Sequence, residues 1–327
     1  MYKGTPEKRA QRRRRKRHKL TGAPKEGMRK VPSVTFVGGT GRSGTHVVAR
    51  LLASHGKLHL IPVECRFHVE ERGFPGLLAG TVTKREFLRR LRGFWWRGFQ
   101  TNRMRGMFRF VPRERFERAV SAFDEAFDAS PELACRDLFW DLLWPTEADG
   151  EVSGIVEQSC DTIAQAPVLR RLFLDAAFVH VVRDGRDASA SRVSQTKGLI
   201  YPRTRAQGID WWERRLREMD AGAQALAGDR LTEISLDELL ADPSDETLAE
   251  LFAVTNLTPG RRVRGFLSNR MSSDRSNAER WRRGISRSKR RRLDALYTDA
   301  LDRLEADGVS AVPLLRRTYE RRSREPA

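Results

Sequence analysis

Cysteine is scarce in this chain. Its 327 residues include only three, Cys65, Cys135 and Cys160, and these lie far apart in the sequence. An odd number of widely spaced cysteines suits neither a disulfide framework nor the close pairs that bind structural zinc. Proteins without disulfides are typical of reducing compartments, so we expect a cytoplasmic protein.

Long apolar runs are missing as well. No stretch of the sequence approaches the roughly 20 apolar residues that a membrane-spanning helix needs. The basic start of the chain is not followed by a hydrophobic core, so the sequence predicts no secretory signal.

Acidic residues are outnumbered, which gives a net charge of +19. Residues 1–30 alone contain thirteen Lys and Arg against Glu7 and Glu26. This segment has no apolar periodicity, so we expect a disordered basic tail. It could bind a polyanion or an anionic membrane surface, which would hold the protein at the inner face of the membrane. The alternative is a solvated arm with no specific partner.

The remaining sequence contains apolar segments punctuated by glycine. Four of them read as buried strands, at 33–39, 153–159, 176–182 and 231–236. Strands that alternate with helical patterns predict an α/β fold, here a P-loop-like three-layer fold with a central parallel sheet flanked by helices. We expect one domain over 31–310, with a helical insertion near 81–145 and a C-terminal tail over 311–327.

The first strand leads into a glycine-rich loop, "GGTGRSGTH" at 38–46. Glycines let successive N–H groups point inward, and the following helix N-terminus adds partial positive charge, so the loop suits a phosphate or sulfate group. The candidate binding residues are Gly41, Arg42, Ser43, Gly44, Thr45 and His46. A nucleotide-hydrolysing loop would have Lys and Ser or Thr where Thr45 and His46 stand. That mismatch weakens an ATPase or GTPase reading, and a glycine turn without a ligand is the other alternative.

A second motif, "VHVVRDGRDASASRVSQ" at 179–195, places Arg183 at a strand end and Ser191 eight residues later. Together with the loop, this pair could bind two phosphates of one nucleotide. Two other interpretations stay open. The segment could be a turn with self-paired charges, or Asp184 could be a magnesium-binding aspartate.

These two motifs, in this order, resemble the PAPS-dependent sulfotransferases, where PAPS is 3′-phosphoadenosine-5′-phosphosulfate. The resemblance covers about 33–305, and Arg42 makes the loop most similar to tyrosylprotein-type and many bacterial members. It implies that the loop holds the 5′-phosphosulfate and that Arg183 and Ser191 hold the 3′-phosphate. "ERWRRGIS" at 279–286 resembles a late nucleotide-contacting segment, which implies that Trp281, Arg282 and Arg283 contact the cosubstrate. Trp281 could cover the adenine or simply pack.

The resemblance also implies roles in catalysis. Sulfuryl transfer requires cations near the moving group and a base for the acceptor proton, with no metal needed. Arg42 and His46 would stabilise charge, and Glu64 is the best match for the base, although it could instead only pair with Arg66. His68 is the reserve candidate for the base. His46 and His55 are weaker candidates.

Two positions depart from the family pattern. Gln158 stands where some relatives have a catalytic Lys, and Cys160 stands where they have Pro. The implied function is sulfuryl transfer from PAPS to a hydroxyl or amine of a small molecule, glycolipid or saccharide. The alternatives are a P-loop kinase or NTPase and a non-enzymatic nucleotide or polyanion binder.

Overall fold

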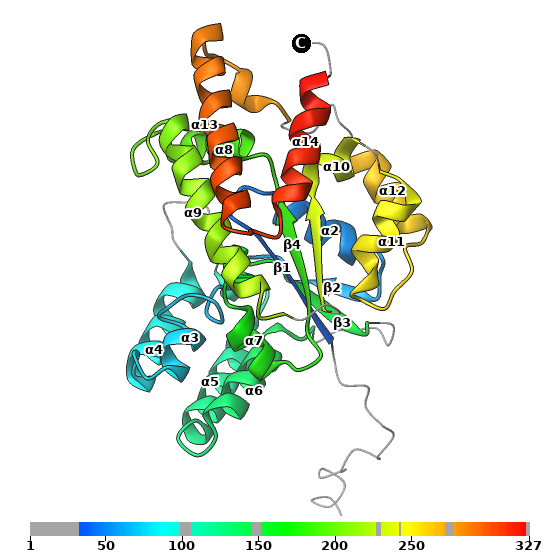
Figure 1. Ribbon diagram of the computed structural model, residues 1–327. Helices are drawn as coiled ribbons and strands as arrows, with labels where there is room; N and C mark the ends of the chain where they lie inside the picture. The colour runs from blue at the N-terminus through cyan, green and yellow to red at the C-terminus, as the bar shows by residue number, and fades with distance from the viewer. Residues whose placement is uncertain are drawn as a thin grey trace, which may run out of the picture. The chain divides into compact units, whose positions relative to one another are not determined.

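A central parallel sheet organises the fold in the computed structural model, which describes residues 33–98, 106–145, 152–226, 230–241, 243–271 and 278–324 (Figure 1). The strand order is β2-β3-β1-β4-β5 and every pairing is parallel. The strands are β1 (Ser33–Gly38), β2 (Leu58–Leu60), β3 (Gly154–Glu157), β4 (Ala177–Val182) and β5 (Leu231–Ser235). The predicted α/β fold is therefore confirmed.

The strands of the sheet centre are buried along almost their whole length. All four residues of β3 and all six of β4 are buried. Both faces of a parallel sheet are covered by helices, so such strands read as continuous apolar runs, which is why the sequence revealed them. Successive side chains of a strand point to opposite faces, so Phe36 and Val37 belong to different core clusters.

One face of the sheet is covered by helices that share a core with Val37 and Val179. They are α2 (Thr45–Ala53), α10 (Leu236–Ala241), α11 (Asp245–Ala253) and α12 (Arg261–Arg270), and α10–α12 lie to the right of the sheet in Figure 1.

The helices on the other face form two groups. The first shares a core with Phe36 and lies below the sheet in Figure 1: α3 (Phe74–Leu78), α4 (Lys84–Arg90), the π-helix η1 (Leu91–Trp95), the 3₁₀ helix η2 (Met107–Arg109), α5 (Arg113–Ala126), α6 (Pro131–Leu143) and α7 (Ala166–Leu172). The second packs around Trp212: α8 (Gly185–Thr196), α9 (Arg205–Ala223), the 3₁₀ helix η5 (Arg280–Arg282), α13 (Arg287–Ala306) and α14 (Val312–Arg324). In Figure 1, α8, α9 and α13 lie to the upper left, and α14 stands above the sheet.

The prediction of a C-terminal tail that begins at residue 311 is wrong. Residues 312–324 form α14, which is part of the domain. Leu315, Thr318 and Arg322 of this helix are buried. The helix was not predicted because Arg322, a residue type that normally marks solvent exposure, contributes to its buried face. The basic tail predicted over 1–30 lies outside the described residues.

The sheet topology has its switch point between β1 and β4. These strands are neighbours, yet the chain leaves β1 toward β2 on one side and leaves β4 toward β5 on the other. Loops that diverge in this way open a binding crevice at the carboxyl ends of the strands. The loops here are the two motifs singled out in the sequence, at 39–44 and 183–185.

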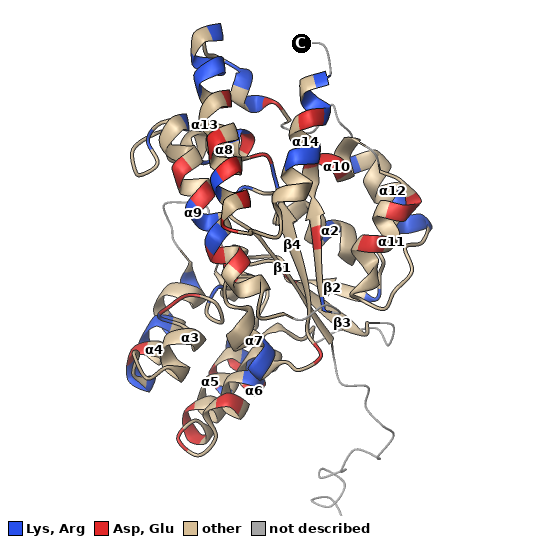
Figure 2. Cartoon of the chain, viewed as in Figure 1, with Lys and Arg blue, Asp and Glu red and all other residues tan. Residues whose placement is uncertain are grey.

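Charge is mixed over most of the molecule, but Lys and Arg gather near the upper ends of α13 and α14 (Figure 2). No helix in the described part of the chain is both long and apolar enough to cross a membrane.

Candidate active site

Glycine is required where the loop leaves β1. A Cβ at Gly39 would lie 2.4 Å from the Ser43 hydroxyl and 2.5 Å from the Val181 carbonyl oxygen. Gly41 and Gly44 have φ angles of +85° and +98°, in the left-handed region that favours glycine. The loop therefore folds back tightly against β4 and brings its backbone N–H groups to the end of the sheet.

The loop ends at a helix N-terminus that has no side-chain cap. α2 begins at Thr45, and its N-cap residue is Gly44. The first N–H groups of a helix have no intrahelical acceptor, and they carry partial positive charge. Beside them, the Ser43 hydroxyl is fully buried and has no hydrogen-bond partner among the described residues. A buried donor without an acceptor costs free energy, which a bound anion would recover.

The second motif meets the first at this point. The Arg42 Nε donates a hydrogen bond to the Ser191 hydroxyl at 2.9 Å. The Arg183 Nη1 donates to the Arg42 carbonyl oxygen at 3.1 Å. Arg183 is 8% exposed and Ser191 is 5% exposed. The structure thus brings together three residues that the sequence predicted for the two ends of one nucleotide.

Positive charge accumulates around these residues. Reduced hydration lowers the pKa of Arg42, and the neighbouring Arg183 and Arg280 lower it further. Reduced hydration also lowers the pKa of Arg192 on α8, with a further contribution from Arg42. Mutually repelling guanidinium groups are stabilised by a shared anion, so this cluster has the electrostatics of an anion site.

A buried network of charges holds the second motif in place. Arg322 of α14 contacts three buried carboxylates: Asp184 at 3.1 Å, Asp187 at 3.0 Å and Asp237 at 2.7 Å. Burial would raise the pKa of Asp184, but Arg186 and Arg322 hold it below the ordinary range. Two guanidinium groups, those of Arg186 and Arg322, form ion pairs with the Asp184 carboxylate. The interpretation of Asp184 as a magnesium-binding residue is therefore not supported. No group of three His, Cys, Asp or Glu suited to a metal ion occurs in the described ranges.

Trp281 is not an open stacking surface, contrary to the possibility that it covers the adenine. It is 3% exposed, and the guanidinium of Arg186 lies 4.6 Å from its ring centroid. Asp187 accepts hydrogen bonds from the backbone N–H groups of Glu279 and Trp281, which draws this segment against α8. Packing is therefore the role that the structure gives to Trp281.

Arg282 and Arg283 flank the same segment. Arg282 pairs with Glu279 at 2.9 Å, whereas the Arg283 side chain is exposed. Within the described residues, no hydrogen bond or ion pair joins the side chain of either arginine to the loop.

Glu64 lies at the rim of the loop. The Cys160 thiol is 3.8 Å from its Oε1, and the Thr45 hydroxyl is 4.0 Å from the same sulfur. The Glu64 side chain keeps 41% exposure, yet the surrounding protein reduces its hydration and raises its pKa, an effect that Arg66 partly offsets. A carboxylate with a raised pKa beside an anion site is suited to accept a proton.

The three candidate histidines lie in different places relative to the loop. His68 is fully buried and its Nε2 lies 3.0 Å from Glu157, so the reserve base of the sequence analysis cannot reach a substrate. His55 lies beside Phe252 near the far end of α2. His46 is exposed in the first turn of α2, where reduced hydration lowers its pKa. Of these three candidates, His46 is the one that lies at the loop.

Gln158 does not face the loop. It is 1% exposed and donates a hydrogen bond to the Ile61 carbonyl oxygen at 3.2 Å. Cys160 does reach the loop region, and burial raises its pKa to about 12, so its thiol stays protonated. This thiol therefore supplies no charge to the site.

A profile of the sulfotransferase family matches residues 33–258. The chain belongs to the sulfotransferase family. It is accordingly a transferase of sulfur-containing groups, and the predicted family is confirmed. No curated protein sequence matches the chain.

A solved sulfotransferase structure has a similar fold at low sequence identity. The sulfotransferase domain from the curacin biosynthetic pathway is 15% identical, with a TM-score of 0.50 over 84% of this chain and 98% of that one. The sulfotransferase domain of the Synechococcus PCC 7002 olefin synthase is 17% identical, with a TM-score of 0.44 over 78% of this chain and 88% of that one. The first of these similarities concerns the fold alone, and nothing is concluded from the second.

Sequence reasoning missed two residues that lie beside the loop. Trp211 lies against it, where a Cβ at Gly41 would be 3.7 Å from its ring. Arg215 also reaches the loop from α9 and pairs with Asp161. Their helix carries no motif, so nothing local in the sequence signals this role. Trp212, the neighbour of Trp211, is by contrast fully buried and packs in the core.

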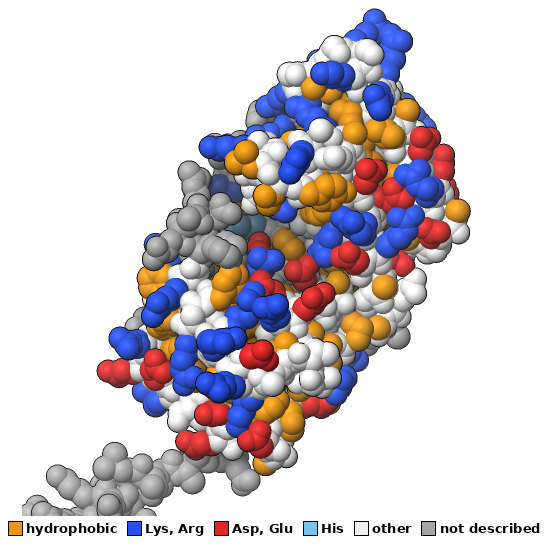
Figure 3. All heavy atoms as spheres, turned by 90° about the vertical axis from the view of Figure 1, so that its left-hand side faces the viewer, with side chains coloured by type: hydrophobic (Ala, Val, Ile, Leu, Met, Phe, Trp, Pro, Cys, Tyr) orange, Lys and Arg blue, Asp and Glu red, His pale blue; other side chains and the backbone are white. Residues whose placement is uncertain are grey.

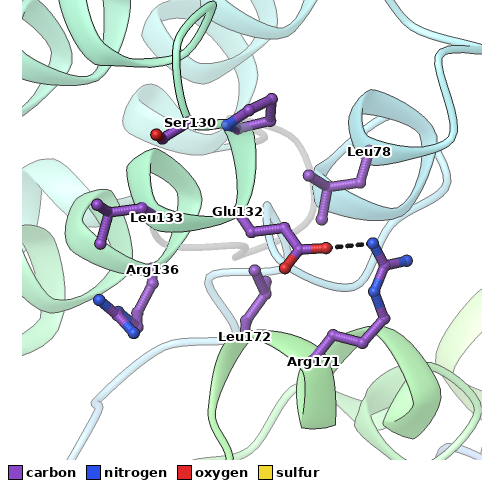
Figure 4. Close-up of a pocket in the computed structure, with 8 residues that line it drawn as sticks. Leu78, Ser130, Glu132, Leu133, Arg136, Arg171 and Leu172 are labelled. Atoms are coloured by element: carbon purple, nitrogen blue, oxygen red, sulfur yellow. Dashed lines mark hydrogen bonds and ion pairs between the residues drawn. The ribbon is translucent and has the colours of Figure 1, made fainter.

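Two pockets open on the sulfotransferase surface, and neither is lined by residues of the 39–44 loop. One of about 600 Å³ is lined by Glu70, Arg90, Asp161 and Arg215, and it adjoins the loop through Arg215. The other, of about 640 Å³, lies between α6 and α7, where Glu132 pairs with Arg171 (Figure 4). The first is the better placed to receive an acceptor.

Proposed function

We propose that this sulfotransferase moves a sulfuryl group from PAPS to a hydroxyl of a small molecule, glycolipid or saccharide, with an amine as a possible alternative acceptor. The observation that carries the proposal is the Arg42–Ser191 hydrogen bond together with the Arg183–Arg42 contact. These contacts join the 39–44 loop to the second motif at one place. A cosubstrate with anionic groups at both its 5′ and 3′ ends suits two adjacent anion sites.

The residues of the loop fit the phosphosulfate end. The unpaired Ser43 hydroxyl and the free N–H groups at the start of α2 would donate hydrogen bonds to it. Arg42 would offset the charge that develops on the leaving oxygen. Arg183 and Ser191 would hold the 3′-phosphate, since a buried guanidinium and hydroxyl at a strand end provide directional donors.

Glu64 would act as the base. The acceptor oxygen attacks sulfur, its proton passes to Glu64, and the sulfur–oxygen bond to the phosphate breaks, with the electron pair leaving on the phosphate oxygen. The raised pKa of Glu64 makes it a stronger base than an ordinary carboxylate. The reaction class requires positioning and charge stabilisation more than covalent help from the protein.

A transfer assay tests this proposal. The chain is incubated with a panel of a phenol, an alkyl alcohol and a saccharide, together with either sulfur-labelled PAPS or γ-phosphate-labelled ATP, with and without a magnesium chelator. We expect labelled acceptor from PAPS, formed equally with and without the chelator. Transfer of the γ-phosphate of ATP instead, with no turnover of PAPS, would contradict the proposal and favour a kinase.

A further inference from the structure

An apolar tip projects from the loop between α8 and α9. Leu199, Ile200 and Tyr201 form this tip, and they are 75%, 57% and 46% exposed. Scattered apolar residues on a surface are ordinary, but three consecutive large ones are not. Lys197 and Arg203, both exposed, flank the tip on either side.

A basic segment, residues 280–292, lies next to this loop. Eight of its thirteen residues are Lys or Arg and none is acidic. The two ends of the loop are tied to it: Arg280 donates to the Ser194 hydroxyl at 3.4 Å, and Arg205 donates to the carbonyl oxygens of Trp281 and Arg283, both at 2.8 Å. Tip and basic segment therefore belong to one surface.

The positive charges of the basic segment repel one another when no partner is bound. Its second half is the start of α13, whose first turn contains no acidic residue. Helix N-termini favour negative charge, yet Arg287, Lys289 and Arg290 stand there, exposed and without an acidic partner within ion-pair distance in the part of the chain that the structure describes. A negatively charged partner would offset this repulsion.

The face seen from the left of Figure 1 shows the resulting pattern. In its upper part, Lys and Arg side chains lie among hydrophobic ones, with acidic residues mainly to one side (Figure 3). A polyanion such as a nucleic acid would need the cations but would gain nothing from exposed Leu and Ile. An anionic bilayer would use both, because apolar side chains enter the interface while Lys and Arg contact the headgroups.

We propose that the apolar tip and the basic segment together dock this protein on an anionic lipid surface. The inference goes beyond sulfuryl transfer and is independent of the basic tail at 1–30. Docking in this way would also fix where the anion site lies relative to the membrane. Arg280 of the basic segment donates to Ser194 of α8, and Ser191 of the same helix accepts from Arg42, so docking would hold the anion site near the headgroups.

Co-sedimentation of the full chain with lipid vesicles tests the proposal. Vesicles of phosphatidylglycerol mixed with phosphatidylcholine are compared with vesicles of phosphatidylcholine alone, and heparin serves as a soluble polyanion. Leu199→Ser/Ile200→Ser should weaken binding to the anionic vesicles roughly tenfold, because the variant lacks the two aliphatic side chains that would enter the bilayer interface. The same variant should bind heparin like the wild type. Lys289→Gln/Arg290→Gln should weaken both interactions.

Matched controls come from the opposite end of the molecule in Figure 1. Leu174→Ser removes a side chain that is 72% exposed, and Arg113→Gln/Arg118→Gln removes two exposed cations of α5. Both should bind like the wild type, and all variants should keep its melting temperature. The tail is unchanged in every variant, so it cannot produce a difference between them. Equal vesicle binding by the Leu199/Ile200 variant and the wild type would overturn the proposal, as would binding to heparin but not to vesicles.

Discussion

At the scale of single residues, Glu64 is the group whose protonation should control turnover. Reduced hydration raises its pKa above the ordinary 4.5, and Arg66 opposes that shift. A base works only when deprotonated, so activity should fall as the pH drops through this raised value. Glu64→Gln should lower kcat by about 100-fold or more while leaving nucleotide affinity unchanged, as measured by steady-state kinetics.

Arg66→Met provides the finer test of the same residue. It removes a cation whose Nε lies 4.0 Å from the Glu64 carboxylate. The pKa of Glu64 should rise further, so the acidic limb of the pH–rate profile should move to higher pH. Glu246→Gln, an exposed acid on α11, is the control and should leave the profile unchanged. An acidic limb that stays in place in Arg66→Met would argue against Glu64 as the base.

At the scale of elements, α14 clamps the second motif through one side chain. Arg322→Met would leave Asp184, Asp187 and Asp237 without their shared cation. Removing one partner of a buried ion pair costs about 3–5 kcal/mol of unfolding free energy. Chemical denaturation should show this loss.

The control lies two residues further along the same helix. Arg324 is 82% exposed and pairs with the exposed Glu320, so Arg324→Ala should change stability by about 1 kcal/mol or less. Wild-type stability in Arg322→Met would show that α14 does not hold the motif.

The elements also show what the sequence could reveal. Strands β1, β3, β4 and β5 were predictable because buried parallel strands are continuous apolar runs. β2 was missed because it has only three residues, Leu58 to Leu60, with a polar histidine at its centre. α14 was missed because its decisive contact is an arginine buried by three distant aspartates. Such pairing depends on the tertiary fold and leaves no local pattern.

The proximity of the two motifs was predictable in a similar way. Arg42, Arg183 and Ser191 lie together because each belongs to a motif at a strand end, and the parallel sheet brings those ends together. Trp211 and Arg215 were not predicted beside the loop, since they reach it from the middle of a long helix. Trp281 looked like a nucleotide contact in sequence, but the hydrogen bonds from its segment to Asp187 draw it into the core.

At the scale of the whole molecule, buried carboxylates should make the fold sensitive to acid. Burial opposes the charge of Glu157, Asp184 and Glu233, but hydrogen bonds and cationic partners lower the pKa of each. A group whose pKa is lower in the folded state stabilises at pH above its unfolded value and loses that contribution as pH falls. The unfolding free energy should therefore decrease as the pH drops below 4.5, the ordinary value for glutamate.

Glu233→Gln should flatten this dependence, because it removes one group with a lowered pKa. Asp187, whose pKa is raised by burial and by Asp184, acts in the opposite direction and limits the slope. Denaturation of the wild type and of Glu233→Gln at several pH values measures the pH dependence of the unfolding free energy in each protein. A slope that is unchanged in Glu233→Gln would show that this carboxylate does not contribute.

The most direct test of the account is a calorimetric titration with adenosine-3′,5′-bisphosphate, the desulfated product of PAPS. The wild type, Arg42→Ala and Arg183→Ala are compared with Arg50→Ala, an exposed arginine of α2 outside the site. We predict metal-independent binding that weakens in both site variants and not in the control. Absence of binding to the bisphosphate, alongside magnesium-dependent binding of ATP, would contradict the assignment of the two motifs to one PAPS site.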